Sequence, residues 1–173
     1  KRRLRSAAEP APGDNVDLAD IYKNPYAPMH IINTCMNLTS DPAEQLVQRD
    51  RKGMPLAVVP GGLSYSDKLF AMPKPDGKSE ADAKMTVGEW IGVSGAAFTT
   101  GLGRSTSLGF SLLLGLANVR LGRWWASGIY RHDLQIHDTG PRKWFKTQFY
   151  LIDEFLARFY GVRREMQYLS DGG

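Results

Sequence analysis

The chain has 173 residues, 42% hydrophobic and 23% charged, which is the composition of a globular protein with enough apolar residues for a core. The formal net charge of +4 comes largely from four cations within residues 1–5, so the remaining charges argue against a nucleic-acid groove across the fold. The single cysteine, Cys35, excludes an intrachain disulfide and a cysteine-based zinc site.

Residues 1–24 contain charges, alanines and prolines and are predicted to form a basic arm or linker ahead of the folded part. Such an arm can stay solvated, or its cations can contact anionic lipid headgroups. A third alternative, binding of the arm to nucleic acid, would require an affinity that falls steeply with salt.

Two apolar segments with β-branched residues predict strands. The first covers residues 29–38, and the second covers residues 56–59 and ends at a Pro-Gly-Gly sequence, which predicts a tight turn. Residues 41–53 are charged and are expected on the surface as a turn or helix fragment. Residues 73–84 are expected to form a polar loop.

Three helices are predicted in the second half of the chain. Thr86 and Glu89 have the spacing of a capping box, so a helix should begin there and run to about residue 97. A leucine stripe predicts a second helix over residues 107–121. The third, residues 141–160, has an apolar stripe expected to face the core and a charged side expected to face solvent. The stripe comprises Phe145, Phe149, Ile152, Leu156 and Phe159, and the charged side comprises Lys146, Asp153, Glu154 and Arg158.

Residues 165–169 predict a last strand, which leads directly into Asp171, Gly172 and Gly173. The order of strands and helices predicts an α/β fold, in which ligands bind beyond the carboxyl ends of strands. The two glycines let the chain turn and let another backbone or a substrate come close. Asp171 is therefore a candidate base for a nucleophile on a neighbouring strand, and an ordinary Asp-Gly turn is the alternative.

Ser94 lies in Gly-Val-Ser-Gly-Ala, residues 92–96, which departs from the G-x-S-x-G nucleophile elbow at Ala96. An elbow serine sits on a strand-to-helix turn, whereas a helix beginning at Thr86 places Ser94 about two turns inside. A packing role is therefore expected for Ser94, which remains a minor candidate for the nucleophile.

Two other groups of residues contain side chains of the kind that build sites. His132 and His137 would face opposite sides of a strand and would also diverge on a helix, so they do not form a recognisable metal site and are expected in a surface loop. The adjacent pair Trp124 and Trp125 can anchor at a lipid headgroup layer or pack half-buried under a loop. No metal site or cofactor motif is predicted.

The sequence Tyr-Leu-Ser-Asp-Gly-Gly at residues 168–173 resembles the segment that closes the core of bacterial patatin-like phospholipases, above all the large members similar to cytosolic phospholipases. Other stretches resemble this family in the same order: residues 28–34 with residues 37–38, residues 48–53 followed by Pro60, residues 91–97 (Ile-Gly-Val-Ser-Gly-Ala-Ala) and residues 118–122 (Asn-Val-Arg-Leu-Gly) with Trp125. The resemblance extends from about residue 25 to the end of the chain.

The resemblance implies a patatin-like three-layer α/β fold, with a central mixed sheet flanked by helices, of which residues 25–173 form the C-terminal part. It implies a phospholipase or lysophospholipase with a Ser–Asp dyad, in which Asp171 is the catalytic aspartate and Gly172 and Gly173 form the turn at the site. The nucleophilic serine and the glycine-rich oxyanion loop would lie upstream, in the other half of the domain, so this piece alone is expected to be inactive.

The same resemblance implies the partners. They are a lipid acyl-ester substrate, a membrane contacted peripherally, and the upstream half of the domain, with neither cofactor nor metal nor nucleic acid. A cytoplasmic location is expected. The alternative is a non-catalytic lipid-binding or interaction module with a patatin-like fold.

Overall fold

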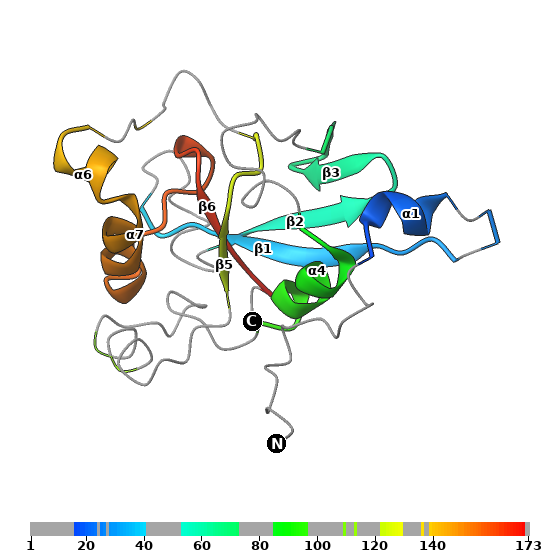
Figure 1. Cartoon of the computed structure of the whole chain (residues 1–173), viewed down its shortest axis with the longest axis horizontal. Helices are drawn as coiled ribbons and strands as arrows, with labels where there is room; N and C mark the ends of the chain where they lie inside the picture. Colours follow the sequence, from blue (N-terminus) through cyan, green and yellow to red (C-terminus); the bar gives the residue numbers. More distant parts are fainter. Residues whose placement is uncertain are drawn as a thin grey trace.

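The computed structural model describes residues 16–23, 25–26, 28–40, 53–72, 85–96, 109, 113, 122–129, 136 and 139–171. Its centre is one six-stranded sheet with the strand order β4-β3-β2-β1-β6-β5 (Figure 1). The strands are β1 (Ile32–Asn37), β2 (Gly53–Val59), β3 (Gly62–Tyr65), β4 (Lys68–Phe70), β5 (Arg123–Trp125) and β6 (Gln167–Ser170). The helices are α1 (Leu18–Tyr22), α4 (Val87–Ser94), α6 (Pro141–Trp144), α7 (Lys146–Phe155) and the short 3-10 helix η3 (Gly161–Arg163).

The chain combines helices and strands as expected for an α/β protein, but all the pairs among the six described strands are antiparallel. The expectation of a mixed sheet is therefore wrong for these strands. Tight turns cause part of this arrangement, because a two-residue connection can only join antiparallel neighbours. Pro60 and Gly61 join β2 to β3, and Ser66 and Asp67, with φ of 49° and 61°, join β3 to β4.

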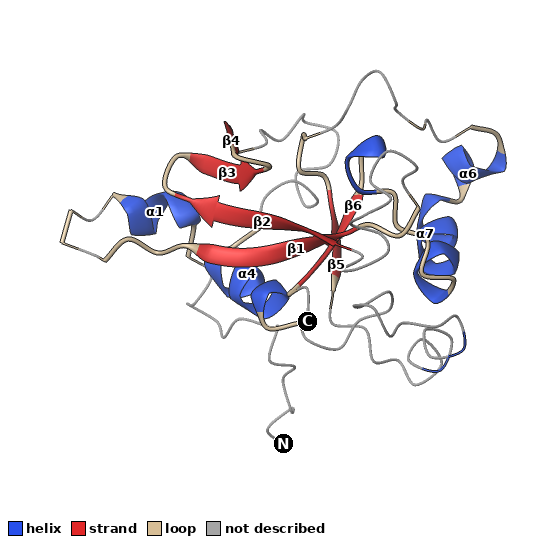
Figure 2. Cartoon of the chain, turned by 180° about the vertical axis from the view of Figure 1, so that it is seen from behind, coloured by secondary structure: helices blue, strands red, loops and turns tan. Residues whose placement is uncertain are grey.

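One side of the sheet, which we call the α4 face, is covered by α4 (Figure 2). Met36 of β1 and Leu169 of β6 lie side by side on it, and both are fully buried. From α4, Trp90 packs edge-on against Trp125 of β5, with ring centroids 4.8 Å apart and planes at 82°. The core on this face is apolar, and its buried members are Leu18, Met36, Leu56, Val58, Leu63, Met85, Trp90, Val93, Trp125, Ile129, Val162 and Leu169.

The opposite side of β5 and β6, which we call the α7 face, is packed with aromatic rings. Trp124 of β5 and Tyr168 of β6 are register partners, with ring centroids 5.2 Å apart. Tyr150 of α7 stacks on Trp124 at 4.8 Å, and Phe159 stacks on Tyr168 at 4.7 Å. Four rings therefore join α7 and the turn after it to the sheet.

The structure corrects the helix predicted over residues 141–160. Phe145, with φ −115° and ψ 46°, interrupts it, so that α6 and α7 are separate helices. The predicted sidedness is correct for Phe159, which is buried, and for Lys146 and Arg158, which are exposed. It is wrong for Asp153 and Glu154, which are buried, and for Phe145 and Ile152, which are exposed. The reason is that both carboxylates have hydrogen-bond partners on the inner side of α7.

The helix predicted from Thr86 is confirmed with its capping box: Glu89 N–H donates to the Thr86 hydroxyl, and Thr86 N–H donates to the Glu89 carboxylate at 2.9 Å. It ends at Ser94 rather than residue 97. The strands predicted over residues 29–38, 56–59 and 165–169 are confirmed as β1, β2 and β6 with shifted ends. Of the helix predicted over residues 107–121, only Gly109 and Leu113 lie within the described residues, and both are helical.

Most of the other predicted loops fall outside the described residues, namely most of the arm and residues 41–52 and 73–84. In the part of the chain that is described, no helix combines the length and the hydropathy needed to cross a bilayer.

Candidate functional site

Asp171 follows directly on β6, as the sequence predicts, and its surroundings are set by the position of that strand. β6 lies between β1 and β5, and Ser170 is the register partner of Cys35 near the middle of β1. Asp171 is therefore half-buried at the end of an inner strand rather than at the edge of the sheet. Gly172 and Gly173, the predicted turn at the site, lie outside the described residues.

A buried polar contact fixes the backbone just before Asp171. The Ser170 hydroxyl donates to the Asn37 side-chain carbonyl at 2.7 Å, and both residues are almost completely buried, at 0% and 2% exposure. A hydrogen bond in such a dry environment is costly to leave unmade, so it holds the end of β6 firmly against the end of β1. The carboxylate that follows is therefore carried on a well-defined backbone.

Cys35 is a nucleophilic side chain close enough to Asp171 to be influenced by its charge. Burial raises the pKa of the Cys35 thiol to about 11, and the negative charge of Asp171 adds to the effect. Only the thiolate is a good nucleophile, so Cys35 is held in its unreactive form at neutral pH. The charge of the Asp171 carboxylate therefore acts on a side chain of the neighbouring strand β1.

The other candidates from the sequence are placed as follows. Ser94 is the last residue of α4, whereas an elbow serine opens a helix, so the surroundings of Ser94 differ from those of an elbow. Trp125 is fully buried against α4 and Trp124 is half-buried in the aromatic cluster, which agrees with the packing alternative for this pair. His132 and His137 lie outside the described residues.

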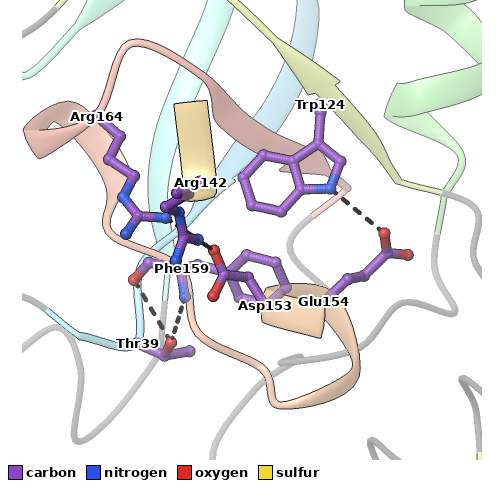
Figure 3. Close-up of polar contacts among 7 residues, drawn as sticks. All are labelled: Thr39, Trp124, Arg142, Asp153, Glu154, Phe159 and Arg164. Atoms are coloured by element: carbon purple, nitrogen blue, oxygen red, sulfur yellow. Dashed lines mark hydrogen bonds and ion pairs between the residues drawn. The ribbon is translucent and has the colours of Figure 1, made fainter. Parts of the chain in front are cut away.

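The structure also reveals a buried ionic cluster around Asp153 and Glu154, two residues predicted to face solvent (Figure 3). The Asp153 carboxylate pairs with the guanidinium groups of Arg142 and Arg164, the latter at 2.8 Å. Arg164 lies over the ring of Tyr160, 4.1 Å from the centroid. Because Asp153 and Arg164 are 3% and 6% exposed, neither charge is stabilised by bulk water, and each depends on its partner.

Glu154 extends this cluster onto the sheet. Trp124 Nε1–H donates to one carboxylate oxygen at 3.3 Å, and the Tyr168 hydroxyl donates to the other at 3.1 Å. Next to it, the Thr39 hydroxyl accepts from Phe159 N–H at 2.8 Å and fixes the turn after α7 to the end of β1 (Figure 3). The cluster therefore fixes the position of α7 relative to α6 and the sheet.

On the α4 face the charged pair of Glu89 and Arg123 joins the start of α4 to β5. Burial alone would raise the pKa of Glu89, but the hydrogen bond from Thr86 N–H and the pairing with Arg123 outweigh it, and the pKa is lowered. Within the described residues, no group of three or more His, Cys, Asp or Glu side chains is arranged to hold a metal ion.

Comparisons with protein-family models, with curated proteins and with solved structures find no match to this chain.

Proposed function

We propose that this chain is the C-terminal part of the catalytic domain of a lipid acyl hydrolase, of the phospholipase or lysophospholipase type. The proposal rests on the resemblance of residues 25–173 to the patatin-like phospholipases. The observation that carries it is the position of Asp171, a half-buried carboxylate that follows directly on the inner strand β6. In the proposed reaction this carboxylate is the base of a Ser–Asp dyad.

In the first step, the serine hydroxyl attacks the acyl carbonyl carbon as Asp171 accepts its proton. The new C–O bond gives a tetrahedral oxyanion, which a glycine-rich loop stabilises with backbone N–H groups. The intermediate then expels the alcohol, which takes the proton back from Asp171, and leaves an acyl-serine. Water, deprotonated by Asp171, hydrolyses this ester and restores the serine.

A carboxylate is a weak base, so the dyad requires tight alignment and exclusion of water. Two described features support that alignment: the pairing of β6 with β1, and the buried hydrogen bond between Ser170 and Asn37. The protonated Cys35 thiol beside Asp171 does not compete with the serine for an acyl group, because its pKa is about 11.

In this proposal the serine and the oxyanion loop belong to a segment upstream of Lys1, and the chain by itself is inactive. The lipid substrate brings the protein to a membrane surface from the cytoplasm.

Labelling with a fluorophosphonate, followed by peptide mass spectrometry, tests the proposal on a protein that includes the upstream segment. We expect the label on one serine of that segment, and loss of ester hydrolysis by about 10³-fold or more in Asp171→Asn. The matched control is Asp67→Asn in the β3–β4 turn, which should hydrolyse esters at the normal rate. A label on Ser94 would move the nucleophile into this chain, and full activity in Asp171→Asn would exclude Asp171 as the base.

The alternative is a lipid-binding or interaction module with the same fold and without catalysis. It predicts no labelled serine and no hydrolysis, together with retained binding to lipid. The labelling experiment therefore separates the two functions.

A further inference from the structure

The outward surface of α6 and α7 is unusually apolar. Trp144 is 85% exposed, Phe145 is 56% exposed, Ile152 is 47% exposed and Leu151 is 37% exposed. We call these four side chains, with Lys143 and Lys146, the α6–α7 surface. The other tryptophans differ from Trp144, since Trp90 and Trp125 are fully buried and Trp124 is half-buried.

The ionic cluster explains why these apolar side chains face outward. Asp153 and Glu154 occupy the side of α7 that faces the sheet, where Arg142, Arg164, Trp124 and Tyr168 hold them. With 3.6 residues per turn, Ile152 must then lie on the far side of the helix, and Leu151 lies at its flank. Rotating α7 to bury them would expose the hydrogen-bonded carboxylates and leave Arg164 buried without a partner. The outward position of the apolar residues is therefore built into the fold.

The charge of this surface has one sign. Residues 141–152 include Arg142, Lys143 and Lys146 but no acidic residue. The two acids that follow, Asp153 and Glu154, are buried on the inner side of α7. Lys143 and Lys146 are exposed and flank Trp144 and Phe145. Aromatic rings between lysines suit a layer that is apolar below and anionic at its surface, which is the headgroup region of an anionic bilayer.

We propose that the α6–α7 surface binds the headgroup layer of anionic membranes. Trp144 and Phe145 insert their rings among the upper acyl chains, and Lys143 and Lys146 contact lipid phosphates. The biological meaning of this contact rests on the proposed function, since a lipid acyl hydrolase meets its substrate at a membrane. The binding itself requires no hydrolysis and is testable separately.

The test is flotation of the full chain with vesicles of ether-linked phosphatidylcholine, with and without ether-linked phosphatidylglycerol. An acyl hydrolase cannot cleave either lipid, because neither contains an acyl ester. The variants are Lys143→Gln with Lys146→Gln, and Trp144→Ala with Phe145→Ala. The matched control is Lys68→Gln with Leu69→Ala, a cation next to an apolar residue, both exposed on β4. The cations of residues 1–5 are retained in every protein, so they cannot account for a difference.

We expect binding that needs the anionic lipid and a blue shift of the Trp144 emission. The lysine variant should lose about fivefold in affinity for each lysine replaced, and the aromatic variant about tenfold or more. The control should bind as the unmodified chain does. Circular dichroism should be unchanged in all variants because the replaced side chains are exposed.

Two results would overturn the proposal: no binding to anionic vesicles, or variants that bind as well as the control. Light scattering without vesicles provides a further check. A dimer that dissociates in the aromatic variant would assign this surface to a second copy of the chain instead. Binding to ether-linked vesicles, together with no hydrolysis of ester-linked ones by a protein that includes the upstream segment, would count against the proposed enzyme and leave the docking surface intact.

Discussion

The two faces of the sheet are stabilised in different ways. On the α4 face, apolar side chains such as Trp90, Met36 and Leu169 are buried, and the charged pair of Glu89 and Arg123 lies at the margin. On the α7 face, Asp153 and Glu154 are buried among arginines and aromatic rings. The difference shows that a helix can present carboxylates to a sheet when the sheet supplies hydrogen-bond donors and neighbouring segments, here α6 and the residue after η3, supply the counter-charges.

The two arrangements have different energetics. Apolar burial contributes about 25 cal/mol for each Å² removed from water, and loss of one side chain removes its own share. A buried ionic cluster contributes little over an apolar substitute of the same shape, but loss of one member leaves a charge without a partner. Removal of one charged residue from the α7 face should therefore destabilise the protein more than removal of one apolar side chain from the α4 face. Replacement of both members of an ion pair by apolar residues of similar shape should destabilise it less.

The largest effect is expected for Asp153→Ala, which leaves the guanidinium of Arg164 buried and unpaired. We expect the free energy of unfolding to fall by about 3 to 5 kcal/mol, measured by urea denaturation. Asp20→Ala is the matched control, because Asp20 forms a pair with Lys23 at 2.8 Å but is 58% exposed, and it should have little effect. The double variant Asp153→Leu with Arg164→Met should recover most of the lost free energy of unfolding. If it does not, the two faces of the sheet do not differ in the way that their single and double substitutions affect stability.

On the α4 face, Leu56→Ala should cost about 3 kcal/mol, from lost burial and the cavity left behind. Leu56 is 1% exposed, whereas Leu69 on β4 is 64% exposed. Leu69→Ala should therefore stay within about 0.5 kcal/mol of the unmodified protein in the same urea denaturation. Equal losses in the two leucine variants would contradict the burial of Leu56 in the core.

Cys35 tests the surroundings of Asp171. A rise of the thiol pKa from 9.0 to about 11 lowers the thiolate fraction at pH 8; the expected decrease is about 100-fold relative to an ordinary thiol. Reaction with a disulfide reagent should therefore be slow in the folded protein and fast in urea. Asp171→Asn should speed the folded-state reaction modestly, because one of the two causes of the raised pKa is the charge of Asp171. An unchanged rate would place the carboxylate away from the thiol.

The smallest effect is expected at the start of α4. Since the pKa of Glu89 is lower in the folded chain, its carboxylate stabilises the fold above pH 4.5, the ordinary value, and this contribution is lost as the pH falls through the lower folded pKa. Glu89→Gln should cost about 1 kcal/mol at pH 7, and this cost should decrease as the pH falls below 4.5. Thr86→Ala should also cost about 1 kcal/mol, and part of this loss should disappear with the charge of Glu89, because the Thr86 hydroxyl donates to the Glu89 carboxylate at 3.3 Å. A cost for Glu89→Gln that does not change with pH would contradict the lowered pKa.

Local signals predicted much of the α4 face. The capping box of Thr86 and Glu89 set the start of α4, and apolar runs with β-branched residues marked β1 and β2. The short strands β3, β4 and β5 were missed because segments of three or four residues are too short to show alternation. β5 is formed by pairing with β6. Since β6 is distant in the sequence, no local signal predicts this strand.

The α7 face was predicted wrongly for a physical reason. Periodicity assigns apolar residues to the core and charged residues to solvent. It cannot predict that a charged helix residue is buried when its ion-pair partner, such as Arg164, lies outside the helix. The spacing of four between Tyr150 and Glu154, which places both on one side of α7, was the only local signal. For the candidate site, the sequence predicted the position of Asp171 after a strand, which the structure confirms, but its catalytic role stays a prediction.

The strand order has a consequence for how the sheet forms. β1 to β4 are consecutive and joined mainly by local contacts, whereas the Ser170–Asn37 hydrogen bond links residues 133 positions apart. Contacts of such large sequence separation form slowly, because a long loop must close first. Because synthesis is directional, the four-stranded meander can assemble on the ribosome well before β6 emerges. Insertion of β6 between β1 and β5 is thus expected to be a late event in folding, and only then is Asp171 brought beside Cys35.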